Sequence, residues 1–215
     1  MDRAFWEERW KAGRIGFHEG RANTLLERHL ARLGPAGRVF VPLCGKAEDM
    51  AYLAAQGHEV LGIELVAQAV KDFFGEHGLT PTVEQTRALE VHRTDRITLL
   101  AGDVFELRES DVAGVTAVYD RAALVALPGA VRARYVYHLR SILPSGIPLF
   151  LVTFDYSQER MEGPPFAVGE EEVRTRYAGC RIEKLDERPV TTGRLASAGA
   201  EAIEVAWLVT LERSA

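Results

Sequence analysis

Residues 38–65 read RVFVPLCGKAEDMAYLAAQGHEVLGIEL. A short apolar run, Val39 to Val41, ends at a proline, and a second apolar run ends at Glu64. Between them, apolar residues recur at helical spacing in residues 47–54 and the pattern stops at Gly57. The order strand, glycine turn, helix, strand and acid is that of a mononucleotide-binding βαβ unit.

The turn of this unit carries a single glycine, Gly45. A dinucleotide site has G-x-G-x-x-G there, because a pyrophosphate needs close backbone approach at several points. Glu64 follows Gly45 by 19 residues, close to the spacing of about 20 at which an acid binds ribose hydroxyls. We therefore expect Gly45 and Glu64 to contact an adenosyl ligand without phosphates, such as S-adenosylmethionine. The alternative is an ordinary turn followed by a surface glutamate.

The composition indicates one soluble domain, residues 1–215. Hydrophobic residues make up 47% of the chain and charged residues 27%. The net charge of −5 gives no basic excess, so we expect no nucleic-acid partner. The apolar runs are too short to span a membrane, and residues 1–13 are too charged for a signal peptide, so we expect a cytoplasmic protein. The two cysteines, Cys44 and Cys180, have no spacing typical of a disulfide framework or a metal site.

The N-terminal residues 1–36 precede the first strand and should form a helical lid. Residues 2–12 read as an amphipathic helix with Trp6 and Trp10 one turn apart, and Asn23 or Thr24 can cap a second helix that ends at Gly34. Two tryptophans beside a nucleoside site would cover the ligand. The alternative is a helix that packs on the edge of the sheet, where tryptophan serves as bulk.

The rest of the chain completes a three-layer α/β/α Rossmann-like fold. Strands are predicted at 96–101, 116–119 and 147–154, with helices at 66–77, 129–143 and 170–177. Residues 180–187 and 203–212 alternate as an antiparallel C-terminal hairpin does. This makes a mostly parallel sheet of seven strands. Residues 78–95 read as a loop or a weakly ordered insertion, and residues 189–200 as a mobile segment.

Candidate ligand residues follow the predicted strands, where open α/β sheets bind ligands. Asp103 suits the adenine amino group or a neighbouring backbone contact, or is simply a turn aspartate. Arg121 can bind a carboxylate in bidentate fashion, or can form a salt bridge with Asp120 that closes a turn. Phe166 follows two prolines that stiffen its loop. Cys44 lies near Lys46, but no histidine or aspartate stands at a diagnostic spacing, so we expect no covalent nucleophile.

The sequence resembles the thiopurine S-methyltransferase family, most of all its bacterial members. The matching motifs are FWEERWKAGRIGFH (residues 5–18), VPLCGK (41–46), GHEVLGIEL (57–65), GDVF (102–105), YDRAALVALP (119–128) and GPPF (163–166). The resemblance implies a methyltransferase fold with S-adenosyl-L-methionine as methyl donor. It implies that the cofactor contacts are Trp10, Leu43, Glu64 and Arg121, with Trp6, Asp103 and Val104 nearby. It also implies that Phe17, Arg121 and Arg194 face the acceptor.

The expected reaction is in-line methyl transfer to a thiol or thione sulfur. An activated donor needs alignment and exclusion of water more than acid–base groups, so we expect no obligatory general base. Arg121 would hold a negative acceptor or keep a thiol ionised, inside a pocket of Trp6, Trp10, Phe17 and Phe166. No metal is expected. The partner would be a small-molecule thiol, thiopurine or metalloid acceptor. The protein is expected to be a monomer.

Three alternatives share parts of this pattern. The first is a methyltransferase for selenium, tellurium, sulfide or halide acceptors, which the sequence cannot separate from a thiol enzyme. The second is a nicotinamide-dependent oxidoreductase, which has the same βαβ unit but needs the glycines that are missing here. The third is a non-catalytic ligand binder on the same fold, against which the presence of both Glu64 and Arg121 argues.

Overall fold

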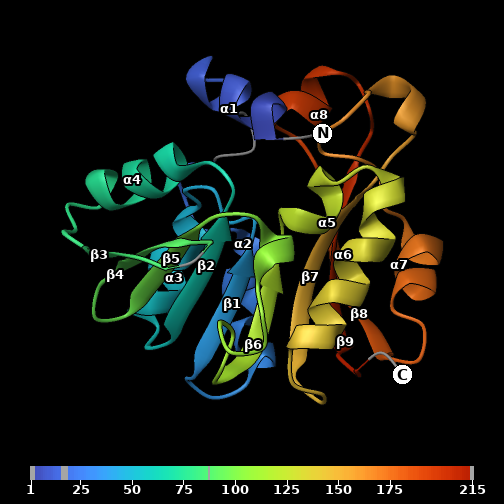
Figure 1. The fold of residues 1–215 in the computed structure, drawn as a ribbon. Helices are drawn as coiled ribbons and strands as arrows, with labels where there is room; N and C mark the ends of the chain where they lie inside the picture. Colours follow the sequence, from blue (N-terminus) through green and yellow to red (C-terminus); the bar gives the residue numbers. More distant parts are fainter. Residues whose placement is uncertain (1–2, 16–18, 87, 214–215) are drawn as a thin grey trace.

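The computed structural model describes residues 3–15, 19–86 and 88–213 (Figure 1). Its helices and short 3-10 turns (η) are α1 (Arg3–Lys11), α2 (Thr24–His29), η1 (Leu30–Leu33), α3 (Glu48–Ala55), α4 (Ala67–Glu76), η2 (Val104–Glu106), α5 (Ala123–Ala126), α6 (Gly129–Ile142), η3 (Gln158–Arg160), α7 (Glu170–Arg176) and α8 (Gly193–Ser197). Its strands are β1 (Arg38–Pro42), β2 (Glu59–Glu64), β3 (Thr82–Gln85), β4 (Glu90–Arg93), β5 (Ile97–Ala101), β6 (Val115–Asp120), β7 (Pro148–Asp155), β8 (Arg181–Pro189) and β9 (Ile203–Thr210).

The strands form one nine-stranded sheet in the order β3-β4-β5-β2-β1-β6-β7-β9-β8. Strands β5, β2, β1, β6 and β7 pair in parallel, whereas β9 and β8 complete the edge as the predicted antiparallel hairpin. The predicted α/β class, the parallel centre and the C-terminal hairpin are therefore confirmed. The predicted number of seven strands is wrong, because β3 and β4 add an antiparallel hairpin at the other edge.

Both faces of the sheet are covered, which gives three layers. Alternate residues of β1 show this directly, since Val39 and Val41 belong to one buried cluster and Phe40 to the other. Helices α2, α3 and α4 cover the face of Val39, and α5, α6 and α7 cover the face of Phe40 (Figure 1). The largest fully buried side chain is Trp207 of β9, whose indole N–H donates to the Thr153 hydroxyl at 2.9 Å.

Two segments that we expected to be irregular have secondary structure. Residues 78–95 contain the β3–β4 hairpin, and residues 189–200 contain α8, which buries Leu195. Every side chain of β3 is exposed, so this edge strand has no apolar alternation to reveal it. Leu195 packs with Tyr156 and Met161 in a small third core, which holds α8 in place.

The N-terminal segment divides into two parts with different roles, so residues 1–36 are not one lid. Helix α2 is capped by Asn23, as predicted, and its Leu25 and Leu26 are completely buried against the sheet. Helix α1 buries no residue and lies at the top of the molecule near α8 (Figure 1). Among the described residues of the predicted lid, those of α2 contribute to the core, whereas those of α1 lie outside it. In the part of the chain that the structure describes, no helix has the length and apolar character needed to cross a membrane.

Substitution of a glycine in β2, with a glycine in α4 as the control, tests the packing of β2. A Cβ at Gly62 would lie 2.6 Å from Leu99 Cδ2 and 2.8 Å from Cys44 Sγ, so Gly62→Ala should lower the free energy of unfolding by about 1–3 kcal/mol. A Cβ at Gly75 in α4 meets nothing within 4 Å, so Gly75→Ala should raise it by about 0.5–1 kcal/mol. Urea unfolding measures both, and equal effects of the two variants would contradict this packing.

Candidate functional site

A cleft of about 770 Å³ opens at the carboxyl ends of the parallel strands. The sheet order reverses at β1, which has β2 on one side and β6 on the other, and such a switch point is where open α/β sheets bind ligands. The walls come from the segments after β1, β2, β5 and β6, and the mouth is lined by α1, by Pro164 and Pro165, and by residues 188–195. The volume lies in the upper part of the range for small-molecule sites.

The glycine turn and Glu64 form one hydrogen-bonded unit at the floor of this cleft. The Gly45 N–H donates to Glu64 Oε2 at 2.9 Å, and the Val66 N–H donates to Oε1 at 2.8 Å. Leu43 and Gly45 both have left-handed backbone, with φ of 47° and 53°, which turns the chain sharply. Glu64 is buried, and burial raises the pKa of its carboxyl although the backbone N–H groups oppose the shift. Each oxygen still has a lone pair for a ligand.

Asp103 and Val104 line the neighbouring wall after β5. Asp103 caps η2, because its Oδ1 accepts from the Phe105 N–H at 3.0 Å. The capping role expected of a turn aspartate and a position on the cleft are thus both found in one residue.

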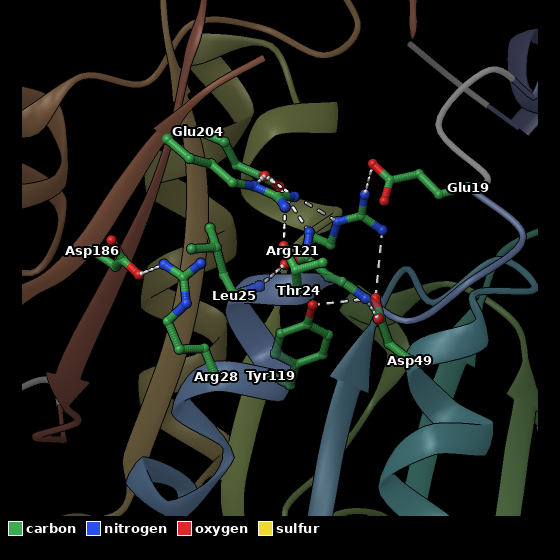
Figure 2. A network of polar contacts seen from close by, with 11 residues as sticks. Glu19, Thr24, Leu25, Arg28, Asp49, Tyr119, Arg121, Asp186 and Glu204 are labelled. Atoms are coloured by element: carbon green, nitrogen blue, oxygen red, sulfur yellow. Dashed lines mark hydrogen bonds and ion pairs between the residues drawn. The ribbon is translucent and has the colours of Figure 1, made fainter. Parts of the chain in front are cut away.

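Arg121 follows β6 and is surrounded by three carboxylates (Figure 2). Its guanidinium lies 2.5 Å from Glu19, 3.4 Å from Asp49 and 3.8 Å from Glu204. Burial alone would lower the pKa of Arg121, but Asp49, Tyr119, Glu19 and Glu204 raise it above its usual value. The group is therefore a permanent cation on the cleft wall.

The two inner carboxylates belong to a wider network (Figure 2). Asp49 accepts from the Asn23 N–H at 2.6 Å and from the Tyr119 hydroxyl at 3.2 Å, and burial raises the pKa of Asp49 despite these donors. Glu204 accepts from Asn23 Nδ2 at 2.9 Å and from Arg188 Nε at 2.6 Å. Asn23 thereby bridges the two acids that hold Arg121.

Asp120 does not pair with Arg121, so the turn-closing salt bridge offered as an alternative is wrong. Its carboxylate accepts instead from the Ala123 N–H at 2.9 Å, the Leu124 N–H at 3.2 Å and the Tyr135 hydroxyl at 2.7 Å. It is completely buried, and desolvation raises its pKa to about 6 although these hydrogen bonds oppose the shift. Asp120 thus accepts from the first N–H groups of α5, and Arg121 is left to face the cleft.

The structure brings most of the predicted site residues together. The residues that line the same cleft are Trp6, Trp10, Leu43, Gly45, Glu64, Asp103, Val104, Arg121 and Arg194. Arg194 donates to the Pro164 carbonyl at 2.8 Å. Phe17 lies outside the described residues. Phe166 is not among the described residues that line the cleft, because its ring packs against Gly163 and lies 5.6 Å from the Arg132 guanidinium.

Cys44 is buried behind the turn, and burial raises the pKa of its thiol well above the usual value, with Glu64 adding to the shift. Lys46 pairs with Glu76. Both facts fit the expectation that Cys44 is no nucleophile. In the described part of the chain, no group of three or more potential metal ligands is present.

Sequence reasoning missed Glu19, Asn23 as a bridge, Asp49 and Glu204. Asp49 is an acid in the first turn of α3, yet its side chain is buried. Glu204 is also buried, although the apolar alternation of Val205, Trp207 and Val209 puts it on the opposite face of β9, so no local signal predicted its burial.

Known proteins resemble this chain over most of its length. The family model for thiopurine S-methyltransferase matches residues 1–213. Thiopurine S-methyltransferase of Pseudomonas paraeruginosa is 52% identical over 193 residues, which are 88% of each chain. That of Pseudomonas putida strain F1 is 48% identical over 188 residues, which are 86% of this chain and 87% of the relative.

Solved structures share the fold at low sequence identity. A methyltransferase from Anabaena variabilis described as dependent on S-adenosylmethionine has a TM-score of 0.69 at 13% identity, over 97% of this chain and 94% of its own. The 1,6-didemethyltoxoflavin-N1-methyltransferase of Burkholderia thailandensis, solved with bound 1,6-didemethyltoxoflavin and S-adenosylhomocysteine, has a TM-score of 0.64 at 18% identity, over 97% of this chain and 87% of its own.

The raised pKa of Asp120 predicts that the protein becomes less stable to unfolding as pH rises. The folded pKa of about 6 lies above the unfolded value of 3.8, so the folded state binds the extra proton between these values and loses stability as pH rises through them. The stability of the wild type relative to Asp120→Asn should therefore fall by about 3 kcal/mol from pH 3.5 to pH 7. Urea unfolding of both proteins across this range gives the difference, and parallel curves would refute the assignment.

Proposed function

The chain belongs to the thiopurine S-methyltransferase family and is an S-adenosylmethionine-dependent methyltransferase, and we propose that it methylates a thiol or thione sulfur of a small molecule by direct in-line displacement. We also propose that it acts as a cytoplasmic monomer. Among the described residues the exposed large apolar side chains are Leu79, Val83, Tyr137 and Ile203, which lie on separate elements or loops rather than on one helix or strand face.

The observation that carries the proposal is the hydrogen bond from Gly45 to Glu64. The turn's N–H that would face a pyrophosphate in a dinucleotide site is bound to a buried carboxylate. A phosphate placed there would find a negative group and would lack that donor. A ribose would find an acceptor with free lone pairs for its hydroxyls. The turn therefore favours a nucleoside without phosphates over a nicotinamide dinucleotide.

The remaining cleft residues fit the other parts of S-adenosylmethionine. Trp6 and Trp10 offer aromatic faces, which attract cations such as a sulfonium. Asp103 and the Val104 backbone lie on the wall next to Glu64, where an adenine amino group can reach an acceptor. Arg121 supplies the positive charge that a carboxylate requires.

The bound donor supplies a methyl group already activated for displacement. The protein then has to align the acceptor sulfur with that methyl group and keep water away, and alignment contributes up to roughly 7–11 kcal/mol in ideal cases. Helix α1 and the residues around Arg194 line the mouth of the cleft. We propose that Arg121 holds an anionic acceptor or favours the ionised form of a thiol, which makes it the residue closest to the chemistry.

Glu64→Gln tests the nucleoside site. It keeps the side-chain shape but replaces a charged acceptor, so the affinity for S-adenosylhomocysteine should fall roughly 10- to 100-fold in titration calorimetry. Glu59→Gln is the matched control, because Glu59 is the exposed residue at the other end of the same strand, β2, and should leave the affinity unchanged. Binding of NAD by the wild type, without binding of S-adenosylhomocysteine, would overturn the proposal.

Arg121→Lys tests the acceptor role. The lysine keeps the charge but loses the planar fork, so kcat/KM for an aryl thiol should fall at least about tenfold. The measurement is release of S-adenosylhomocysteine with thiols, thiopurines, sulfide, halide and selenium compounds as acceptors. Unchanged turnover by Arg121→Lys, or wild-type turnover only with the acceptors that are not thiols or thiones, would reject the proposed assignment. Because Arg121 neutralises buried acids, its replacement can also destabilise the fold, and a thermal melt measures that effect separately.

A further inference from the structure

Of the three carboxylates around Arg121, Glu19 differs from the other two in burial and support. The side chains of Asp49 and Glu204 are 2% and 4% exposed, whereas that of Glu19 is 37% exposed. Asp49 lies on α3 and Glu204 on β9, while Glu19 lies in the connection between α1 and α2. The inner acids also accept hydrogen bonds from Asn23, whereas the partner found for Glu19 within the described chain is Arg121 alone.

The carboxylate of Glu19 is not needed to balance the charges of the two arginines in this cluster. Arg121 and Arg188 are balanced by Asp49 and Glu204, since Arg188 pairs with Glu204 and Arg121 with both acids. With Glu19 present the cluster carries one net negative charge. A ligand anion that took the place of Glu19 would leave the charge around Arg121 as it is now, so exchange requires no new buried charge.

The geometry allows that exchange. Glu19 binds Arg121 Nη2, while Asp49 contacts Nη1 and Glu204 lies nearest Nε. Figure 2 shows Glu19 on the side of the guanidinium away from Glu204. Glu19 and Arg121 both line the cleft. When Glu19 moves away, Nη2 points to the ligand space while the inner acids still fix the plane of the guanidinium.

We propose that Glu19 is a specificity-determining residue that occupies the carboxylate position on Arg121 and is displaced by a ligand carboxylate. The proposal rests on the methyltransferase function proposed above and names a feature of its ligands, a carboxylate next to Arg121. Two ligands can supply it: the amino-acid part of the methyl donor, or an anionic methyl acceptor. Glu19 competes with either one and therefore disfavours weakly binding anions and leaves neutral ligands unaffected.

The test uses ligand pairs that differ in the carboxylate. S-adenosylhomocysteine has one and 5′-methylthioadenosine does not. 2-Mercaptobenzoate has one and benzenethiol does not, and both are titrated into protein saturated with S-adenosylhomocysteine. Titration calorimetry gives each affinity for the wild type, Glu19→Gln and Glu19→Ala. Glu8→Gln is the matched control, because Glu8 pairs with Arg14 on the surface, outside the cleft-lining set.

We expect Glu19→Gln to tighten the carboxylate member of one pair roughly three- to tenfold and to leave the other member unchanged. Glu19→Ala should do at least as much, because it also removes the hydrogen-bond acceptor. An effect on the nucleoside pair identifies the donor as the source of the carboxylate, and an effect on the thiol pair identifies the acceptor. Glu8→Gln should change no affinity.

Two results would overturn the proposal. Equal affinities of wild type and Glu19→Gln for all four ligands would show that Glu19 does not compete, and equal tightening of charged and neutral ligands would show that it is only a steric obstacle. Both leave the proposed function intact. Failure of the wild type to bind S-adenosylhomocysteine would instead remove the proposed cofactor and this inference with it. Thermal melts confirm that each variant is folded.

Discussion

The largely buried guanidinium of Arg121, whose side chain is 13% exposed, is the constraint on which the cleft depends. A charge removed from water is costly unless opposite charges and hydrogen bonds surround it. The structure meets this requirement with Asp49 from α3 and Glu204 from β9, bridged by Asn23 at the start of α2. These elements are distant in the sequence and meet at the carboxyl end of the parallel strands. The network therefore joins the N-terminal segment and the last strand to the wall of the ligand site.

This coupling explains why the N-terminal residues divide into two parts. Helix α2 must sit where Asn23 reaches both acids, and its completely buried Leu25 and Leu26 fix it against the sheet. Helix α1 has no buried residue and contributes to the cleft through Trp6 and Trp10. Glu19 lies between the two helices and touches Arg121, so the connection is tied to the charged wall of the cleft.

The sequence predicted the centre of the sheet and the cleft floor because their signals are local. Apolar runs mark the buried parallel strands, and the spacing from Gly45 to Glu64 marks a βαβ unit. It did not predict the β3–β4 hairpin, whose first strand is fully exposed, nor α8, whose only buried residue is Leu195. The acids around Arg121 were missed because a carboxylate's partner is set by tertiary contacts, and Asp49 and Glu204 stand 155 positions apart in the sequence. The same limit applies to Phe166, which packs beside Arg132 instead of lining the cleft.

The titratable groups of the cleft fit a reaction that depends on alignment of the reactants and not on proton transfer by a side chain. Among the described lining residues there is no histidine, and the thiol of Cys44 is held neutral by burial. Glu64 is engaged by two backbone N–H groups, and Asp49 by Asn23, Tyr119 and Arg121, so neither carboxylate is free to shuttle protons. A methyl group on a sulfonium needs no proton transfer to become reactive, and a thiol needs only to be ionised. We propose that Arg121, a permanent cation on the cleft wall, favours that ionisation without accepting a proton once Glu19 has moved away.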